Sequence, residues 1–301
     1  MTMKSIAMCY SEHAIKVSDS YCSGSVPSNP IAPSSRPADS VRDSVACVYS
    51  VDLSSAGKRF LVGVTWYDTT QRPEFSIGIC EFPFLPSNSG GYYRVRRKQR
   101  GEKVLEIDGL RFEVRWDLSR AEFGSGPEPR ARFYVTVLVD SVGVLFLGDA
   151  DSSPAAAAAK SSLISRSEQF SGMPSYSTRA KFSETGSTHD VAIRYSGREE
   201  EEGSGAVVSI WIDRRKVAEV KRLKWNFRGN ETIFVDGLVI DLMWDVHDMV
   251  CDPTKGCALF LFRTRTGLDS RLWMEEEEKD SPEKLGFSLL ISGCKNKNQN
   301  C

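Results

Sequence analysis

The sequence has few of the residues from which metal and redox centres are built. Its 301 residues include three histidines and eight cysteines, and no two cysteines are separated by only two residues. Zinc ribbons and thioredoxin-type sites depend on a Cys-x-x-Cys pair, so both classes are excluded. We therefore expect no metal centre and no cofactor. We also expect reduced thiols, with Cys47 and Cys80 as small buried apolar side chains.

Long apolar runs are also missing. The longest is VGVLFL at residues 142–147, whereas a helix that spans a bilayer needs ~20 apolar residues. Polar residues interrupt residues 1–19 too often for a secretory signal. The formal charge of −1 provides no overall field to attract nucleic acid or a membrane. We expect a soluble protein of the cytoplasm, with the nucleus as the alternative, and no transmembrane segment.

Helical periodicity is scarce, and short alternating runs take its place. In LRFEVRW, residues 110–116, every second residue is apolar, so the apolar side chains share one face of a strand. The preceding Asp108-Gly109 is a tight-turn signal, because Gly accepts a positive φ and Asp tolerates it. The stretch around it is therefore predicted to be a β-hairpin.

Composition divides the chain into five parts. Ser and Pro dominate the N-terminal arm, whose apolar content is too low to offset the entropy of ordering it. The predicted parts are a disordered arm (1–44), a first β repeat (45–148), an Ala/Ser linker (149–162), a second β repeat with acidic insertions (163–293) and a polar tail (294–301).

One phrase occurs twice in the chain: RGEKVLEIDGLRFEVRWD at residues 100–117 recurs as RGNETIFVDGLVIDLMWD at residues 228–245. Most of the identities are expected at turns and the others on the apolar face, which is typical of a duplicated folding unit rather than a duplicated active site. We expect each repeated arginine to hold a turn or to pair with the repeated aspartate. The matched residues are Arg100/Arg228, Gly101/Gly229, Asp108/Asp236, Gly109/Gly237, Leu110/Leu238, Trp116/Trp244 and Asp117/Asp245.

These patterns predict an all-β protein of two pseudo-repeated antiparallel units with little helix. Short strands at regular spacing are typical of sandwiches and barrels, and the sequence leaves that choice open. It also leaves open whether the two units are separate domains or one closed body.

Asp245, His247 and Asp248 form the strongest local polar cluster, because their N and O atoms are of the kind that metals bind. We predict that they lie on or beside a strand, where neighbouring side chains diverge. The first repeat has no histidine at the equivalent place. A turn or capping role is therefore favoured over metal binding or catalysis, and no catalytic residue is assigned.

A basic run at residues 94–103 offers a second candidate. Arg94, Arg96, Arg97 and Lys98 form a patch that suits phosphate groups, anionic lipid or a protein partner. The alternative is a solvated strand edge on which the charges prevent aggregation. The second repeat carries VKRLKWNFRGN here, with aromatic residues among the charges. The edge interpretation is favoured over binding.

Five tryptophans fall in strand-like runs, where packing in the core is the usual role. The alternative is an exposed aromatic platform for sugars, and core packing is favoured. They are Trp66, Trp116, Trp211, Trp225 and Trp244.

Several stretches, above all RGNETIFVDG with the following WDVHD, resemble a plant family of uncharacterised proteins, domain of unknown function eight-six-eight. The resemblance extends to WDLSRAEFGSGPEPRARFYVTVLVD and SRSEQFSGMPSYSTRAKF, and it covers nearly the whole chain. It implies a plant origin and an intracellular protein. It brings no catalytic residue, ligand or substrate with it.

The leading hypothesis is a non-enzymatic β scaffold that binds a protein partner or a small ligand. It rests on duplicated structural residues and on the lack of a complete catalytic set in the sequence. One alternative is an enzyme whose polar residues converge only in three dimensions. The other is a peripheral protein that binds phosphate or anionic lipid through the basic patch.

Overall fold

The structure is a computed structural model that describes residues 41–53, 57–68, 74–83, 90–95, 99–149, 161–172, 175–196, 205–251, 256–265 and 286–294. Strands joined by turns make up most of these residues, with one short helix, α2 (His247–Cys251). Most of the predicted arm and linker, the acidic insertions and the tail after Cys294 lie outside them. The predicted all-β class with little helix is confirmed.

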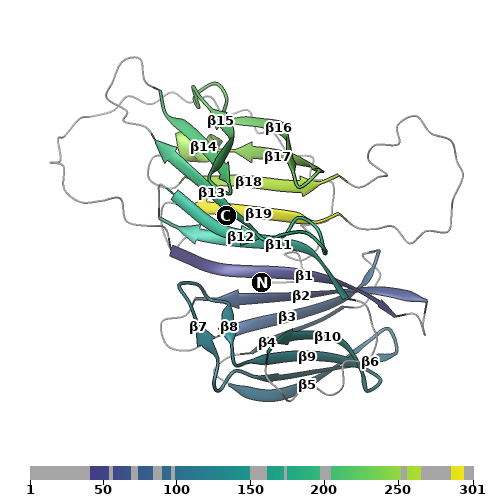
Figure 1. Cartoon of the computed structure of the whole chain (residues 1–301). Helices are drawn as coiled ribbons and strands as arrows, with labels where there is room; N and C mark the ends of the chain where they lie inside the picture. The colour runs from purple at the N-terminus through teal and green to yellow at the C-terminus, as the bar shows by residue number, and fades with distance from the viewer. Residues whose placement is uncertain are drawn as a thin grey trace, which may run out of the picture.

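The largest element is a nine-stranded sheet that runs through the middle of the molecule (Figure 1). Neighbouring strands are antiparallel, except that β19 and β11 are parallel. In spatial order the strands are β16 (Arg228–Val235), β17 (Leu238–Asp245), β18 (Cys257–Thr264), β19 (Ser288–Cys294), β11 (Ser161–Ser171), β1 (Val41–Leu53), β2 (Lys58–Tyr67), β3 (Glu74–Phe82) and β4 (Gly90–Val95).

Two four-stranded antiparallel sheets pack on the large one. The first has the order β10 (Val142–Gly148), β9 (Tyr134–Val139), β6 (Leu110–Asp117) and β5 (Arg100–Ile107). The second has the order β12 (Ser175–Ala180), β13 (His189–Ser196), β14 (Val207–Ile212) and β15 (Arg215–Val220). A small ribbon pairs β7 (Glu122–Phe123) with β8 (Pro129–Ala131). Every sheet is open, so of the two predicted architectures the sandwich is the one observed.

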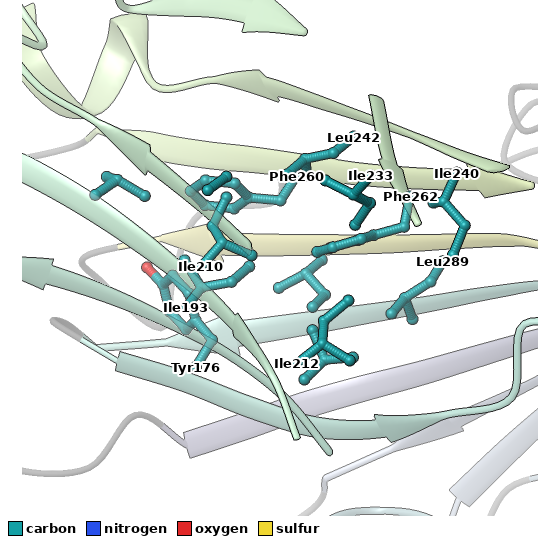
Figure 2. Close-up of a cluster of buried hydrophobic side chains, with 14 of the residues drawn as sticks. Tyr176, Ile193, Ile210, Ile212, Ile233, Ile240, Leu242, Phe260, Phe262 and Leu289 are labelled. Atoms are coloured by element: carbon teal, nitrogen blue, oxygen red, sulfur yellow. The ribbon is translucent and has the colours of Figure 1, made fainter. Parts of the chain in front are cut away.

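Each four-stranded sheet closes its own hydrophobic core against the large sheet. The first core includes Phe60 and Phe112, and the second includes Phe260 and Ile210, all nearly or fully buried. Figure 2 shows the second core, where Tyr176, Ile193, Ile210 and Ile212 of one sheet meet side chains such as Phe260 and Leu289 of the other. The first core draws on residues 49–147 and the second on residues 163–291. Duplication of the whole unit remains a prediction.

Strand register shows that both small sheets cover the same face of the large sheet. Cys47 of β1 lies opposite Val64 of β2 on one side and Arg166 of β11 on the other. Arg166 in turn lies opposite Leu289 of β19. Residues opposite one another on paired strands point to the same face. Since Val64 belongs to the first core and Leu289 to the second, Cys47 and Arg166 lie between the two cores.

The boundaries of β1 and β15 are among those that differ from the sequence prediction. β1 begins at Val41, before the expected start at Val45. β15 ends at Val220, although a strand was predicted as far as Trp225. The chain leaves the strand because Arg222 adopts a φ of 54°, which is incompatible with a strand, and a turn follows.

The cysteines are only partly as predicted. Cys47 and Cys80 are buried free thiols, as expected. Cys257 and Cys294, however, form a disulfide bond, so the expectation of reduced thiols is wrong for this pair. The bond forms because the antiparallel pairing of β18 and β19 places the two residues directly opposite each other. No helix in the described part of the chain is both long and apolar enough to cross a membrane.

Because both cores pack on the same nine-stranded sheet, we predict that they unfold in one cooperative transition. Phe112→Ala in the first core and Phe260→Ala in the second should each lower the free energy of unfolding by about 3–5 kcal/mol, because each leaves a cavity. Continuous pairing from β2 through β1 to β11 should make both variants shift one common transition. Urea unfolding followed by fluorescence and circular dichroism tests this. Two transitions, each sensitive to only one variant, would contradict it.

Candidate functional site

The two copies of the repeated phrase fold as hairpins of the same local geometry. β5 and β6 in one copy, and β16 and β17 in the other, pair without a register shift. The equivalent cross-strand pairs are Arg100–Asp117 with Arg228–Asp245, and Gly101–Trp116 with Gly229–Trp244.

Each hairpin closes through its repeated Asp-Gly turn. Asp108 and Gly109 have φ values of 57° and 77°, and Asp236 and Gly237 have φ values of 50° and 78°. A β-carbon on Gly109 or Gly237 would meet no other atom within 4 Å. Backbone conformation rather than close packing therefore explains these two glycines, because a side chain at such a φ is strained. Gly237 is a turn residue in this structure.

The other repeated glycines lie within strands, so the expectation that most of the identities are at turns is wrong for them. A β-carbon on Gly101 would lie 2.7 Å from Cζ2 of Trp116, and one on Gly229 would lie 2.3 Å from Cζ2 of Trp244. No other residue fits these positions unless the indole moves. The recurrence of glycine with tryptophan therefore has a packing cause.

The repeated arginine and aspartate also meet. Arg228 Nε donates to Asp245 Oδ2 at 2.8 Å, and Arg100 Nε lies 3.7 Å from Asp117 Oδ2. The second carboxylate oxygen accepts a backbone N–H two residues further on, that of Ser119 or His247. Burial raises the pKa of Asp117, but the hydrogen bonds from Ser119 outweigh it and the net pKa is lowered. These four residues close the open ends of the hairpins.

The prediction that His247 and Asp248 diverge on a strand is wrong. They begin the short helix α2, and His247 Nδ1 lies 3.0 Å from Asp248 Oδ1. The chain turns here because Asp245 caps the N–H of His247, so a capping role is observed for Asp245. Its other oxygen is already bound by Arg228. No group of three or more potential metal ligands occurs within the described ranges.

Of the predicted basic patch, the structure describes only Arg94, because Arg96, Arg97 and Lys98 lie outside the described residues. Arg94 is held on its own sheet. Its Nε donates to Glu74, and its guanidinium lies 4.6 Å from the ring centroid of Tyr67. Phosphate or partner binding by the whole patch remains a prediction.

Tryptophan burial follows the sequence prediction with two exceptions. Trp66 and Trp116 lie in the first core, and Trp244 packs against the second. Trp211 is partly buried on the outer face of β14, because Ile210 and Ile212 occupy the inward positions of that strand. Trp225 is 84% exposed, so its expected place in a core strand is wrong. It lies in the turn between β15 and β16 rather than in a strand.

In each repeated hairpin the first strand forms a sheet edge, and the two edge strands carry different side chains. β5 is the edge of the first four-stranded sheet and carries Glu102, Lys103 and Glu106, all exposed. β16 is the edge of the nine-stranded sheet. It has Asn230 and Phe234 at the positions equivalent to the two glutamates, and the exposed Glu231 at the position equivalent to Lys103. Phe234 is 70% exposed. Charges on edge strands discourage pairing with other chains, and β16 carries fewer of them.

The outer face of the large sheet next to β16 is partly apolar. Cross-strand register places Met243 of β17, Leu261 of β18 and Leu290 of β19 in one row, each partly exposed. Leu259 of β18 is 38% exposed. Both hairpins carry a paired acid at the equivalent outward position: Glu113 is bound by Arg111 and Arg115, and Asp241 is bound by Arg265. The two hairpins thus share a backbone and differ in the surface they present.

Sequence reasoning missed a buried charged group between the two cores. Arg166 Nε donates to Glu168 Oε1 at 2.6 Å, and its two terminal nitrogens donate to the Glu128 carboxylate at 3.2 and 2.7 Å. Thr178 Oγ1 also donates to Glu168 Oε1, at 2.6 Å. The members of this junction cluster are Arg42, Cys47, Glu128, Arg166, Glu168 and Thr178, contributed by β1, the β7–β8 ribbon, β11 and β12.

Glu168 is the centre of the junction cluster and is fully buried. Its Oε2 lies 3.0 Å from Arg42 Nε without the alignment of a hydrogen bond, so their attraction is electrostatic. Arg42 also donates through Nη2 to the carbonyl of Ser177 at 2.8 Å. A sequence signal existed, because Arg166, Glu168 and Phe170 alternate along β11 and so share its inward face.

The protonation states in the junction cluster favour a structural role. Burial raises the pKa of the Cys47 thiol to about 12, although the charge of Arg166 opposes this. A thiol that stays protonated is a poor nucleophile. Burial lowers the pKa of Arg166, but the bond to Glu128 and the surrounding negative charge outweigh it, and the net pKa is raised. The arginine therefore remains a fixed cation.

A second cluster holds two turns together through His189. Its Nδ1 lies 2.6 Å from Asp213 Oδ2, and its Nε2 lies 3.0 Å from Asp236 Oδ2. Asp213 is in the β14–β15 turn and Asp236 is in the repeated Asp-Gly turn. Burial lowers the pKa of His189, but the hydrogen bond and charge of Asp213 and the charge of Asp236 outweigh it, and the net pKa is raised. Both ring nitrogens donate when the imidazole is charged.

The junction cluster can be tested by removing its central carboxylate. Glu168→Ala should lower the free energy of unfolding by about 3–5 kcal/mol, because it leaves buried arginine charge without a partner. Glu128→Ala is the matched control and should cost less, since Glu128 is 32% exposed and water can replace it. Chemical denaturation measures both. Equal losses would show that burial of Glu168 is not the determining factor.

His189 should make stability depend on pH. Its pKa is raised on folding, so the stabilisation is complete below the unfolded pKa of about 6.5 and is lost as pH rises through the folded pKa. His189→Gln should therefore flatten the fall in melting temperature on the alkaline side. His247→Gln, which changes a more exposed imidazole, is the control. An unchanged pH profile in His189→Gln would contradict this assignment.

Comparison with known proteins assigns the chain to a family without assigning an activity. A family model described as plant protein of unknown function (DUF868) matches residues 40–295. A search of curated proteins and a search of solved structures each found no significant match. The matched residues include both cores, both repeated hairpins and the junction cluster. Because the match covers far more than half of the chain, the protein belongs to the DUF868 family of plant proteins.

Proposed function

We propose that the protein is a non-enzymatic β scaffold that binds a protein partner at strand β16. The observation that carries the proposal is the difference between the two repeated hairpins. β5 has an edge protected by charges, whereas β16 has the same length and register with an exposed phenylalanine at the position equivalent to Glu106. An edge strand offers unpaired backbone groups that another chain can pair with.

The surroundings of β16 specify the chemistry of the partner. In the described part of the chain, β16 pairs only with β17. A strand added beside it would extend the row of Phe234 and Val239, which lie opposite each other. The partner therefore presents an extended segment with an apolar side chain that packs on Phe234. Main-chain pairing gives affinity in this mode, and side-chain packing gives specificity.

The polar groups that the fold brings together are better explained as scaffold than as catalyst. Glu168 is bound by Thr178 and Arg166, and His189 is bound on both ring nitrogens. A catalytic acid or base needs a position within reach of a substrate proton. Internal partners occupy those positions here. We place the binding role in the cytoplasm or nucleus, which the basic run at residues 94–103 favours.

The test introduces at β16 the charge that β5 carries. Phe234→Glu should weaken binding of a partner captured from plant tissue at least tenfold, because loss of an aromatic anchor commonly costs about 2 kcal/mol. Val142→Glu is the control, since Val142 is 49% exposed on another edge strand. Affinity should be measured with the purified partner, together with hydrogen exchange of the β16 amides.

Protection of the β16 amides on binding, lost in Phe234→Glu and kept in Val142→Glu, would support the proposal. A partner that binds Phe234→Glu as tightly as wild type would refute it. Size-exclusion chromatography tests the remaining alternative, in which a second copy of the chain pairs with β16. A dimer that Phe234→Glu dissociates would assign the edge to a second copy of the chain instead.

A further inference from the structure

The turn between β15 and β16 presents the most exposed tryptophan of the described residues. This Trp225 turn comprises residues 221–227, KRLKWNF. Trp225 is 84% exposed, whereas Leu223 two positions earlier is buried in the second core. Burial of a large aromatic side chain is among the strongest contributions to folding or binding. A tryptophan left in water therefore needs an explanation outside the fold.

Hydrogen bonds fix the backbone that carries Trp225. The N–H of Trp225 donates to the carbonyl of Arg222 at 2.8 Å, and the N–H of Asn226 donates to the same carbonyl at 3.0 Å. Asn226 Nδ2 donates to the carbonyl of Lys221 at 2.8 Å. The indole is thus displayed from an ordered turn, which reduces the entropy lost on binding.

The C-terminal side of the turn is fixed to the repeated hairpin. Trp244 Nε1 donates to the carbonyl of Asn226 at 3.1 Å, and the N–H of Val246 donates to the carbonyl of Phe227 at 2.8 Å. Phe227 packs against the second core. Leu223 and Phe227 point inward, and Trp225 between them points out.

Positive charge surrounds the exposed indole. Lys221, Arg222 and Lys224 are all exposed. The nearest acidic residue along the chain, Glu219, is already shared by Lys216 at 2.6 Å and Lys221 at 3.1 Å. Arg222 and Lys224 form no ion pair within the described residues. The turn therefore combines one apolar anchor with an excess of cations.

We propose that the Trp225 turn is a docking site for anionic lipid membranes. Tryptophan favours the headgroup level of a bilayer, where its ring is apolar and its N–H finds polar partners. Each Lys or Arg near an anionic membrane surface contributes about 1 kcal/mol, or about fivefold in binding. Trp225 enters the interface, and the three cations contact the headgroups.

The shape of the site favours a lipid surface over other anionic partners. Bases of single-stranded nucleic acid stack in series on aromatic side chains along a basic groove, whereas the Trp225 turn offers a single ring at its tip. A protein would need a pocket shaped for the indole. A bilayer interface accepts a protruding side chain without complementary shape. The site is also distinct from the β16 edge, because Phe234 is near the opposite end of that strand.

The experiment is co-sedimentation of the full chain with vesicles of phosphatidylcholine, with and without phosphatidylserine. Wild type should bind only the vesicles that contain phosphatidylserine, and rising salt should weaken binding. Trp225→Ala should weaken it about tenfold, and the triple variant Lys221→Gln, Arg222→Gln, Lys224→Gln should abolish it. The charge-matched control changes the exposed cations Arg120, Lys181 and Arg215 to Gln and should bind like wild type.

Phe234→Glu should also bind vesicles like wild type, which separates this site from the β16 edge. Three results would overturn the proposal: no binding to phosphatidylserine vesicles, binding that Trp225→Ala leaves unchanged, or equal loss in the charge-matched control. A single-stranded RNA oligonucleotide and soluble glycerophosphoserine are the competing probes. Trp225-dependent binding of the RNA without binding of vesicles would assign the turn to nucleic acid. If glycerophosphoserine competes fully with the vesicles, the turn binds the soluble headgroup and does not need a membrane surface.

Discussion

The buried carboxylate of Glu168 is the constraint on which the joint between the two sandwiches depends. It lies on β11, where the large sheet passes from one core to the other, and it accepts from Arg166 and Thr178 while facing Arg42. A buried charge is tolerated only when partners surround it. Those partners come from β1, β11 and β12, so the cluster fixes how these strands meet. Apolar side chains at the same place would pack without directional bonds and would not fix the relative positions of the strands in this way.

Buried charged groups of the protein are paired with one another, whereas some of its large apolar side chains are exposed. The junction cluster and the His189 cluster each satisfy their charges internally, and the Cys47 thiol remains protonated because it is buried. Of the large apolar side chains in the described residues, the two most exposed are Phe234 on an edge strand and Trp225 on a turn. Phe234 lies on β16, and Trp225 lies in the turn that precedes this strand. Apolar side chains left in water are the reason that binding, rather than catalysis, is the function proposed here.

The repeated hairpins show how one backbone serves two surfaces. Arginine, aspartate, glycine and tryptophan recur because turn geometry and close packing allow few alternatives. Outward-facing positions are free of those constraints, and there the copies diverge. One hairpin presents Glu113 between two arginines, and the other presents Phe234, Val239 and Met243 around the Asp241–Arg265 pair. The hairpins also occupy different sheets, since β5–β6 belongs to a four-stranded sheet and β16–β17 to the nine-stranded one.

Local patterns in the sequence were enough to predict the all-β class and the two hairpins with their Asp-Gly turns. They also gave the pairing of Arg228 with Asp245 as one of two alternatives. These depend on residues close in sequence, whose geometry is set by φ preferences and by alternation along a strand. Only the tertiary structure decided which strands lie side by side across the chain. It placed Cys257 opposite Cys294, and it brought Arg42, Glu128 and Thr178 to Glu168. It also left Trp225 in solvent, because a single residue, Arg222, takes a positive φ that ends the strand. Contacts between distant segments depend on the register of whole sheets, which no local pattern specifies.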